Sequence, residues 1–180
     1  MRQTLQSQAQ SQNLLLENQS LLTERRNTLS QILLSLAAQR RRICLDLTRI
    51  YPIEPIDSAL TFTIRGVKLP AAGKWGDVSE EEVATALGWC AHLCWLLALY
   101  LGVPLRYPMQ PVGGRSLVRD PVSIMMGSRT YTPHGGERNV DWYRFPLYAA
   151  GGDQHRFDYA VFLLNKDIEQ VLRQFCRGGC

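Results

Sequence analysis

Helix-breaking residues are missing from the first fifty residues, which contain neither proline nor glycine. Leucine, glutamine and arginine, which all favour helices, dominate this segment instead. Their dominance excludes a series of tight turns and predicts one long helix. We expect the helix to end before Pro52, because the residue ahead of a proline disfavours the helical conformation.

Acidic residues are also scarce there. Seven arginines face three acids in residues 1–50, a balance of +4 that equals the net charge of the whole chain, so the remainder is neutral. This excess permits contact with an anionic membrane or an acidic partner. It falls far short of the dense basic stripe that is typical of nucleic-acid binding.

Three further signals are lacking. The five cysteines are odd in number, which favours reduced thiols in an intracellular protein over a disulfide framework. Residues 1–13 are polar and rich in glutamine, unlike a secretory signal. The longest apolar stretch, around Leu93–Leu101, is shorter than a bilayer requires.

An apolar residue recurs every seven positions along the first segment, which predicts a coiled coil. These positions are Leu15, Leu22, Leu29, Leu36, Ile43 and Ile50. The accompanying seam positions are Gln19, Arg26, Leu33, Arg40 and Leu47, of which three are polar or charged. Burying arginine at a self-paired seam is costly, so we expect a different chain with acidic residues opposite Arg26 and Arg40. The alternative is a long helix that packs on its own domain.

The partner-binding residues that this pattern predicts are Leu15, Leu22, Arg26, Leu29, Leu33, Leu36, Arg40, Ile43, Leu47 and Ile50.

Residues 52–180 have the mixed pattern of an α+β domain. Alternation over Leu60–Ile64, a turn at Arg65-Gly66 and an apolar return at Val67–Leu69 predict a hairpin. Ser79 and Glu82 form a capping box, and an apolar helix follows that ends at Gly102 and Pro104. That helix is too apolar for the surface, so we expect it to be the central helix of the core.

The later elements are less regular. We expect strands at Val103–Tyr107, near Leu117–Val118 and at Phe145–Tyr148, and a mobile insertion at about 127–143. The nearly continuous apolar run Phe157–Leu164 predicts a strand covered on both faces, with Asn165 capping a last helix. The predicted division is therefore a coiled-coil helix over 1–51 and a globular domain over 52–180.

Catalytic and metal sites have little support. His92 lies between Cys90 and Cys94, but positions two apart point to different sides of a helix, so a core or boundary histidine is favoured. Zinc would need Cys90, Cys94, Cys176 and Cys180, which lack the usual close pairs. We expect no catalytic residue, no metal and no cofactor, with a thiol or metal enzyme as the remaining alternative.

Several segments together resemble one family. They are RRRICLDLTRIYP at Arg40–Pro52, FTIRGVKL at Phe62–Leu69, ALGWCAHLCWLLALYLGVPLRYP at Ala86–Pro108, GGRS at Gly113–Ser116, FPLY at Phe145–Tyr148 and FDYAVFLLNKD at Phe157–Asp167. In this order they are similar to the UV radiation resistance-associated protein and its fungal vacuolar-sorting counterpart. That family provides the endosomal subunit of the class III phosphatidylinositol 3-kinase complex.

The resemblance implies a non-catalytic scaffold on endosomal, autophagic or vacuolar membranes. The helix would pair with the coiled coil of a Beclin-type subunit, and the globular part would be an autophagy-specific, Beclin-like C-terminal domain. The kinase activity would belong to the class III phosphatidylinositol 3-kinase, which a regulatory kinase-like subunit accompanies. The chain would lack the membrane-binding C2 domain of the family, so we interpret it as a fragment or shortened product.

Two alternatives remain open. The chain resembles, less closely, the autophagy-specific subunit of the sister kinase complex. It would otherwise act as a membrane-surface adaptor, which binds anionic lipid through Arg40, Arg41 and Arg42 and through exposed aromatic residues. The aromatic candidates for membrane contact are Trp75, Trp142 and Tyr143, for which the favoured alternative is packing on the domain itself.

Overall fold

The computed structural model describes residues 2–56, 61–69, 78–122, 143–149 and 153–177. It divides into two compact units, Met1–Arg42 and Ile43–Cys180. An α+β class, with one long N-terminal helix, small antiparallel sheets and further helices, is confirmed.

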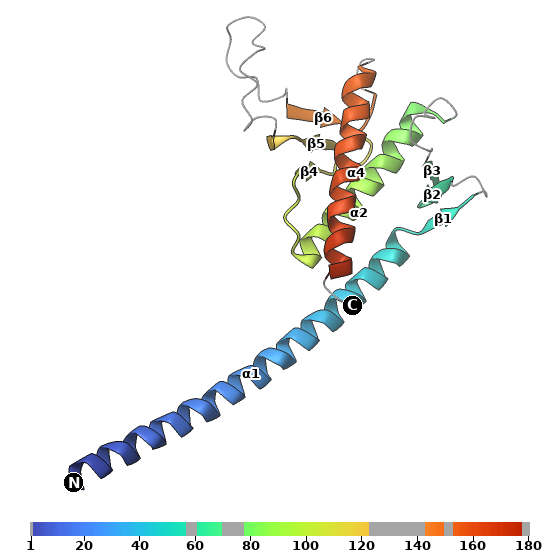
Figure 1. Cartoon of the computed structure of the whole chain (residues 1–180). Coiled ribbons are helices and arrows are strands. Elements are labelled where there is room, and N and C mark those ends of the chain that lie inside the picture. The colour runs from blue at the N-terminus through green and yellow to red at the C-terminus, as the bar shows by residue number, and fades with distance from the viewer. Residues whose placement is uncertain (1, 57–60, 70–77, 123–142, 150–152, 178–180) are drawn as a thin grey trace, which may run out of the picture. The chain divides into compact units, whose positions relative to one another are not determined.

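Helix α1 runs without interruption from Arg2 to Ile50, as the absence of helix breakers predicts (Figure 1). At its C-terminal end, the Tyr51 N–H donates a hydrogen bond to the Leu47 carbonyl oxygen at 2.8 Å. Pro52 follows, so the predicted end of the helix is confirmed. The part of α1 up to Arg42 lies in the first unit, and the turns from Ile43 onward belong to the second.

The first sheet contains β1 (Ile53–Pro55), β2 (Phe62–Ile64) and β3 (Val67–Leu69) in an antiparallel order. The predicted hairpin is confirmed, with Ile64 opposite Val67. Its turn places Arg65 at φ 52° and Gly66 at φ 77°, the left-handed conformations that a tight hairpin requires. Strand β1 was not predicted because proline signals a break, but proline is tolerated on an edge strand.

Helix α2 (Glu80–Leu101) is the central helix of the second unit. One of the two hydrogen bonds of the predicted capping box is present: the Glu82 N–H donates to Ser79 Oγ at 3.3 Å. At the other end Gly102 adopts φ 70°, as the glycine stop predicts. The buried side chains of α2 include Val83, Leu87 and Ala91, so its predicted place in the core is confirmed.

By length and composition alone, α2 would reach across a membrane, and among the described residues it is the one helix that does so. The expectation that no stretch is long enough is therefore wrong, because it counted only the apolar run at the end of the helix. Eight residues of α2 are buried in the second unit, so its position beside the core gives a physical reason for this composition.

The second sheet contains β4 (Met109–Gln110), β5 (Leu117–Arg119) and β6 (Arg144–Pro146), again antiparallel. The strands predicted near Leu117 and Phe145 are confirmed. The strand predicted at Val103–Tyr107 is wrong. Its backbone donors bond elsewhere: Arg106 N–H donates to Gln170 Oε1 at 3.0 Å, and Tyr107 N–H donates to Asp167 Oδ1 at 3.1 Å. Side chains therefore satisfy this segment instead of a neighbouring strand.

Helix α4 (Gln154–Arg177) replaces the strand that the apolar run Phe157–Leu164 predicted. The buried members of the run include Phe157, Ala160, Val161 and Leu164, which follow the helical spacing of three and four. The run looked continuous because Phe162, which is 49% exposed, is also apolar. The helix begins earlier than predicted, where Asp153 Oδ1 accepts the Arg156 N–H at 3.2 Å, and Asn165 lies in its interior.

The second unit thus repeats one arrangement, three antiparallel strands followed by a helix. Helix α2 packs on β2, β3 and β4, and α4 packs on β5, β6 and α2 (Figure 1). The packing of α2 on the turn before β5 is very close. A Cβ atom added to Gly88 would lie 2.1 Å from the Gly113 carbonyl oxygen, so only glycine fits there. The predicted insertion at about 127–143 lies outside the described residues, except for Tyr143.

Candidate partner-binding surface

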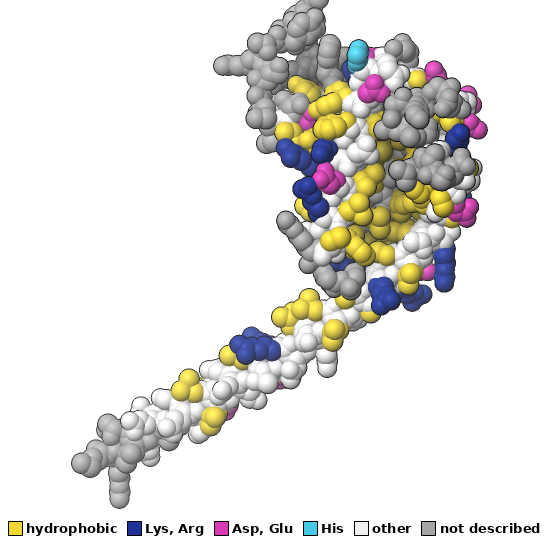
Figure 2. Space-filling model, turned by 45° about the vertical axis from the view of Figure 1, so that its right-hand side comes forward, with side chains coloured by type: hydrophobic (Ala, Val, Ile, Leu, Met, Phe, Trp, Pro, Cys, Tyr) yellow, Lys and Arg dark blue, Asp and Glu magenta, His cyan; other side chains and the backbone are white. Residues whose placement is uncertain are grey.

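The predicted seam begins as an exposed apolar stripe on the first unit. Exposure is 67% at Leu15, 54% at Leu22, 56% at Leu29, 55% at Leu33 and 41% at Leu36. Figure 2 shows such apolar groups at intervals along this helix. A lone helix of this kind would be only marginally stable in water, because most helical stability in proteins comes from packing an apolar face. The stripe therefore has the character of a surface that another helix covers.

The seam also carries charge. Arg26 is exposed and Arg40 is half-buried, both at positions where a coiled coil faces its partner. An acidic side chain opposite either guanidinium would form a charge-assisted hydrogen bond. A second copy of this helix would bring two arginines together instead. The role of both residues in partner binding stays a prediction.

The seam positions after Arg42 behave differently. Leu47 is only 5% exposed and forms a core cluster with Tyr51, Ile64 and Ala86 of the second unit. Ile43 packs against the same cluster, whereas Ile50 is 52% exposed. For these last turns the structure matches the alternative from the sequence, in which the helix packs on its own domain.

Heptad counting missed some exposed apolar residues on the first unit. Ile32 is 58% exposed and lies between Leu29, Leu33 and Leu36 along the helix. These four residues have the spacing 0, 3, 4 and 7, which places them on one face. The stripe is therefore widest there. Counting the helical period of 3.6 beside the heptad would have found Ile32. Four other exposed leucines, Leu14, Leu16, Leu21 and Leu34, lie off the seam.

A hydrogen bond fastens the end of α1 to α2. The Tyr51 hydroxyl and His92 Nδ1 are 2.7 Å apart, and Tyr51 itself is buried. The Trp89 ring lies 6.0 Å from the Tyr51 ring, and the Arg65 guanidinium lies 4.5 Å above Trp89. The prediction of a boundary histidine agrees with this position, because His92 is half-buried and its ring nitrogen is used.

Cys90 and Cys94 on α2 do not have the environment of reactive cysteines. Burial raises the pKa of Cys90 to about 11. Burial, followed by the nearby Asp167 carboxylate, raises the pKa of Cys94 to about 12. Both groups are therefore neutral thiols at pH 7, and a thiolate is the nucleophilic and metal-binding form. Within the described ranges no three metal-ligating side chains gather at one place, although Cys180 lies outside them.

The predicted membrane contacts are only partly described. Trp75 and Trp142 lie outside the described residues. Tyr143 is 36% exposed, and its carbonyl oxygen accepts the Asp120 N–H at 3.0 Å. Arg41 and Arg42 are exposed on α1. Lipid contact by any of these residues stays a prediction.

Two curated proteins resemble the chain in sequence. The UV radiation resistance-associated protein of Mus musculus is 36% identical over 138 residues, which are 77% of this chain and 18% of the mouse protein. Vacuolar protein sorting-associated protein 38 of Schizosaccharomyces pombe is 32% identical over 130 residues, 72% of this chain and 24% of the yeast protein. No protein-family model matches the chain.

The matches thus span less than a quarter of the length of either relative, and most of this chain. The resemblance that the sequence motifs indicated is confirmed by these two relatives. Over about three quarters of its length, the chain belongs to the family of the UV radiation resistance-associated protein and vacuolar protein sorting-associated protein 38.

Proposed function

We propose that this chain is a non-catalytic scaffold subunit of a class III phosphatidylinositol 3-kinase complex that serves vacuolar and endosomal sorting. The exposed stripe from Leu15 to Leu36 is the observation that carries the proposal, since such a surface suits assembly with another helix. The family membership supports it, and the fission yeast relative is named for vacuolar protein sorting.

The partner is a Beclin-type coiled-coil subunit. Apolar residues of its helix would pack on the widest part of the stripe, around Leu29, Ile32 and Leu36. Acidic residues would face Arg26 and Arg40, which disfavours a homodimer. The paired helices hold the chain in a complex with the kinase and its regulatory kinase-like subunit, on endosomal and autophagic membranes.

The scaffold role needs no catalytic group in this chain. The half-buried Cys90 and the buried Cys94 have raised pKa values, so both are neutral thiols and poor nucleophiles at neutral pH. The half-buried His92 is engaged with Tyr51. These observations favour assembly over a thiol enzyme.

A direct role at the membrane is a second candidate. Arg41 and Arg42 are both exposed, and the first fifty residues carry the whole net charge of +4. Such a segment is attracted to anionic lipid, and salt screens this attraction.

The vacuolar name of the yeast relative favours the sorting complex over the autophagy-specific sister complex.

Co-expression with a Beclin-type subunit tests the scaffold proposal. We expect a 1:1 complex by light scattering after size-exclusion chromatography, and a helical content above the sum of the separate chains. Leu29→Asp together with Leu36→Asp should abolish the complex, because charges would then lie within the apolar seam.

The matched control is Gln31→Asp with Ala38→Asp. These exposed residues have the same spacing and receive the same charges, but they lie off the predicted seam. The control should form the complex as the parent chain does. Two variants that behave alike, or circular dichroism spectra of the mixture that merely add, would contradict the proposal.

A further inference from the structure

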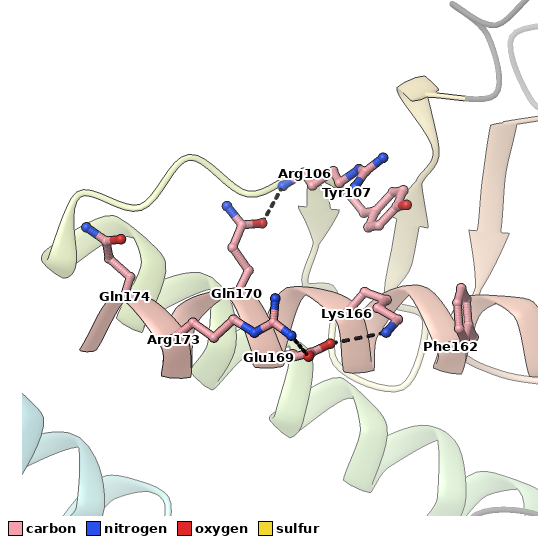
Figure 3. Close-up of a pocket in the computed structure, with 8 residues that line it drawn as sticks. All are labelled: Arg106, Tyr107, Phe162, Lys166, Glu169, Gln170, Arg173 and Gln174. Carbon is pink, nitrogen blue, oxygen red and sulfur yellow. Dashed lines mark hydrogen bonds and ion pairs between the residues drawn. The ribbon is translucent and has the colours of Figure 1, made fainter. Parts of the chain in front are cut away.

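An open groove of about 550 Å³ lies on the second unit, between α4 and the segment that follows α2 (Figure 3). Two of its residues come from that segment and six from α4. They are Arg106, Tyr107, Phe162, Lys166, Glu169, Gln170, Arg173 and Gln174. The volume falls in the range of about 300–1,000 Å³ that is usual for small-molecule sites. Neither the proposed pairing of α1 nor the relatives' names involve this groove.

Hydrogen bonds to α4 fix the wall that carries Arg106. Gln170 Oε1 accepts the Arg106 N–H at 3.0 Å, and Gln170 Nε2 donates to the Pro104 carbonyl oxygen at 2.6 Å. Asp167 Oδ1 accepts the Tyr107 N–H at 3.1 Å. This irregular segment is therefore held in place on both sides of Arg106. Because this wall is already ordered, ligand binding would require a smaller loss of conformational entropy in the protein.

Positive charge dominates the groove, with three cations against one carboxylate. On α4, Lys166 Nζ lies 3.1 Å from Glu169 Oε2, and Arg173 pairs with the other oxygen of the same carboxylate. The hydrogen bond from Lys166, followed by the charge of Arg173, lowers the pKa of Glu169. Two cations of α4 thus already hold one small anion, which belongs to the protein itself.

Arg106 lies on the opposite wall. Its guanidinium lies 5.6 Å from the ring centre of the adjacent Tyr107, and within the described part of the chain no carboxylate pairs with it. Phe162 is 49% exposed at the end of the groove where Lys166 lies, and the Lys166 ammonium is 5.6 Å from its ring centre. The groove therefore offers cations on two walls with an aromatic surface beside each.

We infer that this groove binds a phosphorylated polyol with at least two phosphate groups, one engaged by Arg106 and the other by Lys166 and Arg173. Arginine and lysine are the usual partners of phosphate, and arginine binds it bidentately. The Gln174 amide supplies a donor and an acceptor for hydroxyl groups. The ligand is either a soluble inositol phosphate or the same headgroup on a lipid.

Calorimetric titration of the full chain with myo-inositol 1,3-bisphosphate tests the site. Arg106→Gln with Lys166→Gln should weaken binding at least tenfold, because each charge-assisted hydrogen bond contributes strongly. Lys68→Gln with Arg115→Gln removes two exposed cations elsewhere and should leave binding unchanged. An equal loss of affinity in the groove variant and in the control variant, or no binding by the parent chain, would overturn the inference.

Glu169→Gln gives a second test with the opposite sign. It removes the internal competitor for Lys166 and Arg173, so it should tighten binding several-fold. Glu80→Gln, which removes an exposed acid from the first turn of α2, should not. A weaker affinity in the Glu169→Gln variant would mean that the carboxylate organises the groove for another purpose, and would refute the site.

Vesicles distinguish the two sources of the ligand. Phosphatidylcholine vesicles with phosphatidylinositol 3-phosphate are compared with vesicles of equal charge that contain phosphatidylserine. Binding of the soluble probe alone assigns a soluble ligand, and preferential binding of the phosphoinositide vesicles, lost in Arg106→Gln with Lys166→Gln, assigns a headgroup. The inference is independent of the scaffold proposal, because a chain that fails to pair with a Beclin-type subunit would still bind the probe.

Discussion

The two parts of α1 share one hydrophobic repeat and differ in how far its residues are buried. Leu22 and Leu36 on the first unit are 54% and 41% exposed, whereas Leu47 on the second is 5% exposed. The sequence spacing is the same in both parts. Leu47 is buried because Ile64 and Ala86 pack against it. The heptad repeat alone therefore does not distinguish residues that pack on the chain's own domain from residues that are exposed in the isolated chain.

Replacing a leucine by alanine in each part of α1 tests this difference most directly. Leu47→Ala should lower the free energy of unfolding of the chain alone by about 2–5 kcal/mol, as for other buried leucines. Leu22→Ala should change it by less than about 0.5 kcal/mol, because the side chain is exposed in the unpaired chain. Urea unfolding followed by tryptophan fluorescence measures both, and Trp89 packs against the cluster of Leu47.

The same two variants also test the proposed pairing of α1 with a Beclin-type subunit. In the presence of a Beclin-type subunit, Leu22→Ala should become destabilising, while the cost of Leu47→Ala should stay the same. If both variants lower the free energy of unfolding of the isolated chain equally, the two leucines do not differ in burial in solution.

The second unit also buries a titratable side chain, Asp167, in its interior. Asp167 is fully buried and, because of this burial, its pKa is raised to about 6 despite the hydrogen bond from Tyr107. The ordinary pKa of a solvated aspartate side chain is 3.8. Between these values the folded state binds more protons than the unfolded state. The stability of the second unit should therefore fall, by about 1–2 kcal/mol, as the pH rises from about 4 to about 6.

Asp167→Asn should remove this dependence, because the amide keeps an acceptor for the Tyr107 N–H and does not titrate. Urea midpoints at several pH values between 4 and 7 measure the effect. Asp158→Asn, at an exposed position of the same helix, is the control. A slope that persists in Asp167→Asn would assign the pH dependence to another group.

Much of the fold followed from local signals in the sequence. The long helix, the hairpin at Arg65-Gly66, the cap at Ser79 and the stop at Gly102 each depend on residues close together in the chain. For such elements the backbone conformation is set by the residues themselves. The resemblance to a known family was also carried by short segments in a fixed order, and the two relatives confirmed it.

The errors arose where distant contacts decide the outcome. Val103–Tyr107 is not a strand because side chains of α4, sixty residues later, bond to its backbone. Phe157–Leu164 is a helix whose outward residues are also apolar, which hides the helical period. The groove around Arg106 could not be predicted for the same reason, since its two walls come from separate segments.

The smallest expected effect concerns the contact between the end of α1 and α2, which lies within the second unit. Tyr51→Phe removes the hydroxyl that lies 2.7 Å from His92 Nδ1 and leaves the ring packing in place. The loss of one hydrogen bond at a buried position should cost about 1 kcal/mol. Tyr100→Phe, at a residue that is 41% exposed on the same helix as His92, should cost much less. If the two variants unfold at the same urea concentration, the contact between α1 and α2 depends on the packing of Tyr51 with Leu47 and Trp89, and the hydrogen bond adds no stability to it.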